Sequence, residues 1–327
     1  MPAPSFWWQP GRGLLLSPLA ALYGAAAWLR LRKPGRSVDV PVICLGNLTV
    51  GGAGKTPAAL ALGRLLLAHR ERPFFLSRGY GGRIARPTLV SRSTHRAVDV
   101  GDEPLLLAQL APTIVARNRV AGAQLARAEG ASVIIMDDGF QNPALRKDLA
   151  ILVIDGRRGI GNGRMLPAGP LRAPLHAQMA LAQALIVVGP PDGAAPVLKV
   201  ARRYDTPLFH ARLEPDRQTL DALVGRRILA FAGIADPEKF FATLSEAGLN
   251  VVEKRSFADH HRYTAAEARM LLARAQSQNL VLLTTEKDHV RLAGAPRLAE
   301  LAARTGVLPV RLVIEENDAF RALVEKR

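Results

Sequence analysis

Glycines, a lysine and a threonine between residues 46 and 58 have the spacing of a phosphate-binding loop. Gly51, Gly52 and Gly54 let backbone N–H groups point inward at phosphate oxygens, and the helix that follows directs the positive end of its dipole at the same charge. In such a loop the lysine reaches the β- and γ-phosphates, and the threonine hydroxyl holds Mg²⁺. The strict pattern begins with glycine, where this chain has threonine. We therefore predict a nucleotide-binding loop made of Thr49, Val50, Gly51, Gly52, Ala53, Gly54, Lys55 and Thr56.

The residues on either side of this loop distinguish a nucleotide site from an ordinary glycine-rich turn. An apolar run at 40–45 precedes the loop, and residues 58–68 have the composition of a helix. The resulting order of strand, loop and helix is the context that the signature requires. Pro57 suits the first helical turn, because an N–H group there has no partner within the helix. The sequence therefore favours nucleotide binding.

Acidic pairs occur at two places that suit a metal ion. Asp137 and Asp138 directly follow the apolar run 133–136, and a P-loop enzyme places its metal-side carboxylate at such a strand end. Asp102 and Glu103 open a predicted helix and are either its cap or a base and a metal-side carboxylate. Capping is also the alternative for the first pair. The candidate metal ligands are Thr56, Glu103, Asp137 and Asp138.

Two histidines and two arginine-containing loops are further candidates. His260 and His261 precede a predicted helix, where an imidazole is either an inert surface group or a proton acceptor. Residues 77–82 and 161–172 mix arginine with glycine. Such loops suit the binding of phosphate or sugar groups, although ordinary flexible loops have a similar composition.

The elements that must position these residues alternate between strands and helices. Short apolar runs at 73–77, 88–91, 113–116, 133–136, 149–154 and 184–188 surround helical patterns at 58–68 and 119–129. Such alternation predicts a parallel sheet covered on both faces. The pattern restarts near 215–218, with strands expected at 227–234, 251–257, 280–285 and 307–314 and helices at 237–247 and 265–278. We therefore expect α/β domains over residues 37–220 and 221–327.

The composition restricts the partners of the protein. The 327 residues carry a formal net charge of +16, which suits a polyanionic partner such as nucleic acid, an anionic membrane or a phosphorylated substrate. Cys44 is the single cysteine, so an internal disulfide is excluded and a reducing compartment is expected.

Residues 13–29 are free of charge and resemble a membrane-interface segment. Aromatic residues lie near both ends of this stretch, and four basic residues follow it, at positions 30, 32, 33 and 36. Bilayer interfaces select this combination. The stretch is short for a span. We expect residues 1–36 to form a membrane-associated helix that inserts shallowly, with the catalytic body on the cytoplasmic side; a full span and a buried core helix remain as alternatives.

Eight motifs in one order resemble a known family. They are the N-terminal apolar helix and the segments 46–57, 77–81, 101–104, 137–141, 166–172, 257–260 and 285–288. Together they are similar to tetraacyldisaccharide 4′-kinase, the lipid A 4′-kinase of Gram-negative bacteria, over essentially the whole chain. The loop of that family begins with serine or threonine, as Thr49 does here.

The resemblance implies a fold and a reaction. The expected fold is a P-loop NTPase-like α/β/α sandwich, with a second, smaller α/β lobe that closes the active-site cleft. The expected reaction transfers the γ-phosphate of ATP, with Mg²⁺, to the 4′-hydroxyl of a tetraacylated glucosamine disaccharide 1-phosphate. A monomer is expected at the cytoplasmic side of the bacterial inner membrane, peripheral or monotopic, with the lipid disaccharide as partner and no nucleic acid.

The resemblance also implies roles for individual residues. Asp102 resembles the general base of the family, assisted by His260 from the second lobe, and Arg172 resembles a basic residue of the active-site loop. Asp137 and Asp138 match the acidic metal-side pair. The chain departs from the family at Asn142, where histidine is usual, and at Ala173, where glutamate is common.

Two rival classes fit less well. A P-loop GTPase would carry an Asn-Lys-x-Asp string, and the nearest string, at 285–288, has its lysine one place too late. A nucleic-acid-dependent ATPase would account for the charge, but not for an apolar N-terminal helix flanked by tryptophans.

Overall fold

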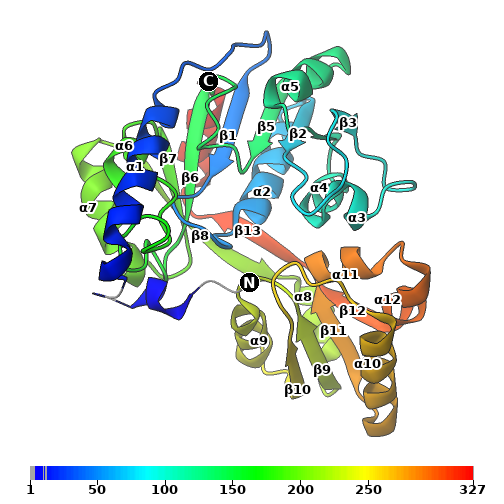
Figure 1. The fold of residues 1–327 in the computed structure, drawn as a ribbon. Coiled ribbons are helices and arrows are strands. Elements are labelled where there is room, and N and C mark those ends of the chain that lie inside the picture. Colours follow the sequence, from blue (N-terminus) through cyan, green and yellow to red (C-terminus); the bar gives the residue numbers. More distant parts are fainter. Residues whose placement is uncertain (1–3, 10, 12, 327) are drawn as a thin grey trace.

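The protein has two lobes, each built on one sheet, in a computed structural model that describes residues 4–9, 11 and 13–326 (Figure 1). The outermost positions of the expected domains, 1 and 327, lie outside the described residues. The first lobe holds a nine-stranded sheet of order β13-β8-β7-β6-β1-β5-β2-β4-β3. Its strands are β1 (Val42–Gly46), β2 (Pro73–Ser77), β3 (Thr88–Leu89), β4 (Thr113–Val115), β5 (Val133–Asp137), β6 (Leu149–Asp155), β7 (Ala184–Val188), β8 (Leu208–Pro215) and β13 (Val310–Ile314).

Helices cover both faces of this sheet, which confirms the expected α/β/α sandwich. On one face, Ala123 of α5 and Val197 of α7 join the buried cluster around β1 and β5. On the other face, Leu62 of α2 and Phe320 of α13 do the same. Seven of the strands are parallel, and their runs are apolar because both faces of the sheet are covered. The helices of this lobe are α1 (Ser17–Leu31), α2 (Lys55–Ala68), α3 (Ala97–Val100), α4 (Asp102–Leu107), α5 (Arg119–Ala128), α6 (Leu175–Met179), α7 (Ala195–Arg203) and α13 (Asn317–Glu325).

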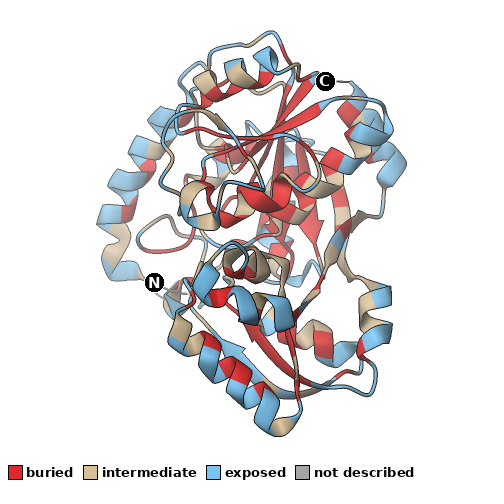
Figure 2. Ribbon diagram, turned by 90° about the vertical axis from the view of Figure 1, so that its right-hand side faces the viewer, coloured by how far each residue is buried: buried red, intermediate tan, exposed pale blue. Residues whose placement is uncertain are grey.

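The second lobe is a smaller α/β unit with a four-stranded parallel sheet of order β10-β9-β11-β12. Helix α10 packs on one face of this sheet and α9 on the other. Buried residues follow the strands of both sheets, while the outer faces of the helices are exposed (Figure 2). The elements are β9 (Arg227–Ala232), β10 (Asn250–Ser256), β11 (Val281–Thr285), β12 (Thr305–Leu308), α8 (Arg217–Leu223), α9 (Pro237–Glu246), α10 (Ala265–Gln278), α11 (Glu286–Leu292) and α12 (Ala299–Arg304).

The end of the chain returns to the first lobe, which corrects the expectation of one strand over 307–314. β12 pairs with β11 in the small sheet, whereas β13 pairs antiparallel with β8 in the large one. Pro309 separates the two strands and has no N–H group for a sheet ladder, which explains the break. Residues 310–325 therefore pack with the large sheet, although the expected second lobe extended to residue 327.

Helix α1 lies against the outside of the large lobe, beside α6 (Figure 1). Gly24 allows the close approach, because a Cβ atom there would lie 2.3 Å from the sulfur of Met165. The opposite side of the helix is exposed, with Leu22 71% accessible, and so is Leu15 in the short turn just before it, at 97%. Over Leu14–Leu31 the helix is long and apolar enough to cross a membrane, and only 17% of that window is buried. This exposure argues against the core-helix alternative.

Candidate active site

The phosphate-binding loop connects β1 to α2 at the carboxyl edge of the large sheet. α2 begins at Lys55 rather than near residue 58, so the lysine and Thr56 belong to its first turn. Gly51 and Gly54 have φ angles of +116° and +86°, a region that favours glycine. The side chain of Asn47 donates to the carbonyl of Gly51 at 3.1 Å and closes the loop. The order of strand, glycine loop and helix is as the sequence predicted, and the loop lies at the start of a helix, where an anion is favoured.

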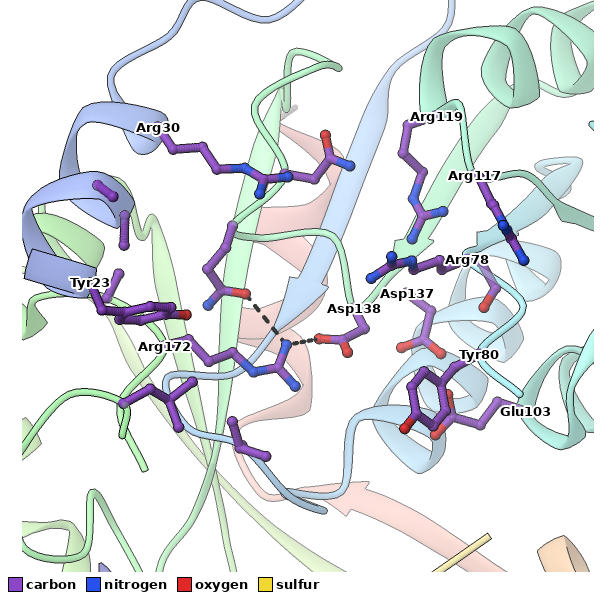
Figure 3. A pocket seen from close by; sticks show the side chains of 18 residues that line it. Tyr23, Arg30, Arg78, Tyr80, Glu103, Arg117, Arg119, Asp137, Asp138 and Arg172 are labelled. Atoms are coloured by element: carbon purple, nitrogen blue, oxygen red, sulfur yellow. Dashed lines mark hydrogen bonds and ion pairs between the residues drawn. The ribbon is translucent and has the colours of Figure 1, made fainter. Parts of the chain in front are cut away.

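Asp138 joins two cationic side chains next to this loop. Its Oδ1 lies 3.7 Å from Lys55 Nζ and 2.6 Å from Arg172 Nη1 (Figure 3). Burial opposes ionisation of Asp138, but the lysine and the guanidinium outweigh it and lower its pKa to about 2. Burial is the main cause that lowers the pKa of Lys55. The residues predicted for charge neutralisation therefore meet at one carboxylate.

Asp137 is almost fully buried, and its Oδ1 has no hydrogen-bond partner. Burial, helped by the charges of Glu103 and Asp138, raises its pKa to about 7. An unpartnered buried carboxylate oxygen suits a cation. Thr56 Oγ1 lies 3.5 Å from Glu103 Oε1 nearby.

These oxygens fit a magnesium ion that arrives with a nucleotide. Among the described residues, no group of three or more His, Cys, Asp or Glu side chains is arranged to hold a metal by itself. Mg²⁺ needs no such group, because it is commonly bound by one or two carboxylates together with substrate phosphates and waters. Thr56, Asp137 and Asp138, with Glu103 at the side, would supply the protein's share.

Asp102 and His260 meet across the two lobes. Asp102 is in the first turn of α4, and His260 is in the loop after β10 with a φ of +56°. His260 Nδ1 lies 3.1 Å from Asp102 Oδ2, and this contact raises the pKa of the histidine. Burial opposes ionisation of Asp102, but the hydrogen bond with His260 and the charge of Arg291 keep the pKa of that carboxyl below its ordinary value. The pair can hold and move a proton.

Helix α11 of the second lobe presents two cations to this acidic turn that the sequence analysis did not identify. Lys287 Nζ lies 2.7 Å from Glu103 Oε1, and Arg291 Nε donates to Asp102 Oδ2 at 2.7 Å. Positions i and i+4 share one face of a helix, so one face of α11 matches the two consecutive acids. Lys287 lies within the motif 285–288 and Arg291 is four residues later, so the shared face of these two cations could be read from the sequence. Their contact with the acids of α4 could not.

A cavity of about 610 Å³ leads from Asp137 and Asp138 to helix α1 (Figure 3). Arg78, Arg117 and Arg119 gather on one side, at the ends of β2 and β4. Arg119 is 2% exposed, and its Nε has no hydrogen-bond partner. Arg172 and Arg30 lie on the other side, where Tyr23, Ala26 and Ala27 of α1 complete the wall. Five guanidinium groups around one cavity make it a site for anions.

Some of the remaining candidate residues line this cavity and others do not. Asn142 and Ala173, the two departures from the family pattern, both line it, and the alanine adds no carboxylate there. His261 does not contact Asp102; its Nε2 lies 3.0 Å from Oε1 of Glu267 on α10. The loop 77–82 contributes Arg78 and Tyr80. Arg117 and Arg119 were missed, although arginines that directly follow a short apolar strand were a usable signal.

A phosphate loop that faces carboxylates, with an aspartate of this lobe paired to a histidine of the second lobe, is the arrangement of a phosphotransferase of the P-loop class. The family model described as Tetraacyldisaccharide-1-P 4′-kinase matches residues 12–327, and the chain belongs to this family. It is therefore a kinase of lipid A biosynthesis that phosphorylates the 4′ position of a tetraacyldisaccharide 1-phosphate.

Individual relatives agree with this assignment. The chain is 52% identical to a tetraacyldisaccharide 4′-kinase of Rhodopseudomonas palustris strain BisA53, over 99% of this chain and 95% of that protein. It is 51% identical to one of Bradyrhizobium sp. strain BTAi1, over 100% of this chain and 95% of that protein. A crystal structure of the Aquifex aeolicus enzyme LpxK in complex with ATP superposes with a TM-score of 0.74 at 27% identity, covering 96% of this chain and 98% of that one.

Proposed function

We propose that the chain transfers the γ-phosphate of ATP, bound with Mg²⁺, and that the nucleotide lies on the loop 49–56. Lys55 and Arg172 both reach Asp138 and lie where transferred charge must be neutralised. The Oδ1 atom of Asp137, which is buried and has no hydrogen-bond partner, supports a metal ion beside Thr56. Thr56, Asp137 and Asp138 would hold Mg²⁺, and the ion would supply positive charge to offset the charge that develops on the phosphates.

The Asp102–His260 pair takes the proton of the 4′-hydroxyl in this proposal. The geometry supports a joint role for the two residues, because His260 contacts Oδ2 of Asp102 and Arg291 holds the same oxygen. The side chain of His260 is 28% exposed and that of Asp102 is 4% exposed, so the histidine is the more accessible member. Asp102 is the base and His260 supports it. Removal of Asp102 leaves the alcohol without its proton acceptor, and removal of His260 leaves that acceptor without its support.

The lipid disaccharide binds in the cavity that joins the acidic pair to α1. The observation that carries this proposal is the continuity of that cavity, which has the candidate metal-side carboxylates Asp137 and Asp138 at one end and the exposed apolar helix at the other. Acyl chains would stay in the bilayer beside α1, while the sugars and the 1-phosphate enter among the arginines. The basic residues that follow α1 support a location of the body on the cytoplasmic side of the inner membrane. In this proposal the enzyme is a monotopic monomer.

Arg119→Met tests this placement. We expect KM for the lipid to rise about 10-fold or more, because a buried guanidinium–phosphate contact is lost, with little change in KM for ATP. An acceptor that lacks the 1-phosphate is the control, since it should bind equally poorly to both proteins. If Arg119→Met weakens binding of both acceptors by the same factor, the arginines do not bind the 1-phosphate.

A further inference from the structure

Arg291 joins the two lobes at the carboxylate of Asp102. Its Nε and Nη2 both donate to Asp102 Oδ2, the Nε at 2.7 Å. The arginine side chain is 7% exposed and the carboxylate 4% exposed, so little water competes for this contact. Two charged N–H groups that donate to one carboxylate oxygen fix the position of that oxygen. The oxygen that faces His260 is therefore held by a residue of α11.

Arg291 is itself fixed by groups buried within the second lobe. Its Nη1 donates to Asp288 Oδ1 at 2.8 Å and to the carbonyl of Gly233 at 2.6 Å. Asp288 is fully buried, and the Tyr263 hydroxyl and the Gly233 N–H donate to the same oxygen at 2.8 and 3.0 Å. A guanidinium held at one end by this network offers a rigid support for Asp102 at its other end.

The same network sets the backbone of His260. The N–H of His260 donates to the carbonyl of Gly233 at 3.1 Å, the atom that also accepts from Arg291. The position of Gly233 therefore influences both members of the proton-accepting pair, the histidine through its main chain and the aspartate through the guanidinium. If Arg291 only held the two lobes together, its contact would not need to be with Oδ2 of Asp102, the oxygen that faces His260.

We infer that Arg291 is a positioning residue that holds Asp102 against His260 when the lobes are together. This inference rests on the proposed role of the Asp102–His260 pair. Arg291 is not among the residues that line the cavity, and in this inference it acts through the placement of Asp102. Loss of the guanidinium is expected to lower kcat with little effect on KM for ATP, whose site is built from residues 49–56 of the first lobe.

The test compares Arg291→Ala with Arg291→Lys and with Arg297→Ala, which removes an exposed arginine of the same lobe. We expect Arg291→Ala to lower kcat about 10- to 100-fold, as for loss of a charged hydrogen bond, and KM for ATP to stay within about 2-fold. Guanidinium ion, added well below denaturing concentration, should restore part of kcat for Arg291→Ala. It should leave Arg297→Ala and the unsubstituted enzyme unchanged. Arg291→Lys should keep less of kcat than the unsubstituted enzyme, because one ammonium group cannot donate from two nitrogen atoms at once.

Three outcomes are decisive. Unchanged kcat in Arg291→Ala overturns the inference. A loss that guanidinium does not rescue, accompanied by a lower melting temperature, means that Arg291 only stabilises the lobe interface. Full activity of Asp102→Ala, measured in parallel, would overturn the proposed role of the pair instead, so failure of the inference and failure of the proposed function are distinguishable.

Discussion

Lys55 and Asp138 face each other beside the phosphate loop, with 3.7 Å between Nζ and Oδ1. The same oxygen accepts from Arg172 at 2.6 Å, so one carboxylate holds two cations at the place where phosphate charge is expected. Asp138 has a left-handed φ of +52°, which turns its side chain back toward the loop. An incoming triphosphate thus meets cations that are already in position, and their reorganisation is small.

Lys55→Ala is expected to abolish turnover while the protein still folds. The lysine neutralises charge on the β- and γ-phosphates, and its removal should lower kcat about 100-fold or more. Lys199→Ala, on the exposed surface of α7, is the control and should leave kcat unchanged. Steady-state kinetics with a circular dichroism spectrum of each variant make the measurement. Activity of Lys55→Ala within about 10-fold of the unsubstituted enzyme would contradict the loop assignment.

Asp102→Ala and His260→Ala are each expected to lower kcat strongly, with smaller effects on KM for ATP. Residues that act as one relay are not additive, so the double variant should be little worse than the more damaging single one. His261→Ala, whose ring contacts Glu267 instead, serves as the control. If Asp102→Ala mainly weakens Mg²⁺-ATP binding and leaves kcat intact, Asp102 is a metal-side ligand. The base would then be sought at Asp137, Asp138 or His261.

Asp137 is expected to make folding stability depend on pH. Its folded pKa of about 7 lies above the ordinary 3.8, so between these values the folded protein binds a proton that the unfolded chain has released. Its contribution to stability is therefore present below pH 3.8 and is lost as the pH rises toward 7. In Asp137→Asn this loss should be absent, so without metal and nucleotide the variant gains in melting temperature, relative to the parent, as the pH rises.

Asp138→Asn is the matched control for this pH experiment, because the pKa of Asp138 is lowered to about 2. A lowered carboxylate pKa contributes stability above the ordinary value of 3.8 and loses it as the pH falls toward 2. Across neutral pH the difference between this variant and the parent should change less than for Asp137→Asn, because Asp138→Asn removes only one of the causes that raise the pKa of Asp137. A constant difference for Asp137→Asn would show that its carboxyl is not perturbed in this way.

Removal of residues 1–33 is expected to shift the enzyme from the membrane to the soluble fraction and to raise KM for the lipid more than for ATP. The exposed leucines of α1 supply the interfacial contact, whereas the nucleotide site is built from later residues. The double variant Leu15→Glu, Leu22→Glu tests the same membrane contact without a truncation. Leu67→Glu, at an exposed leucine of α2, is its control. A truncated protein that fails to fold would indicate that α1 is part of the core instead.

The sequence predicted those elements whose composition follows burial. The run 133–136 became β5, and 149–154 became β6, because strands covered on both faces are apolar throughout. β8 was missed because it is only partly buried and contains Arg212 and Glu214, so its pattern is weak. The division of 307–314 between two sheets depends on pairing with β8, which local pattern does not encode.

The proximity of some candidate site residues could be predicted from strand ends, whereas contacts that depend on lobe docking could not. The loop 49–56 follows β1 and Asp137 ends the adjacent parallel strand β5, so their proximity follows from the fold. Lys287 and Arg291 reach the acidic turn only because α11 packs against α4 across the lobes. The state of Asp137 also could not be predicted, because its raised pKa depends on burial and on two neighbouring carboxylates.

The return of the chain to the large sheet has a consequence for how the enzyme is made. β13 and α13 are synthesised after every other element of the large lobe, and until then β8 has an unpaired edge and the face that Phe320 covers is open. At about 5–20 residues per second, the stretch between Leu31 and Val310 takes roughly 15 to 55 s to synthesise. Helix α1 is made before that interval begins, so the membrane role proposed for it would let a nascent kinase dock on the bilayer well before its nucleotide-binding lobe is complete.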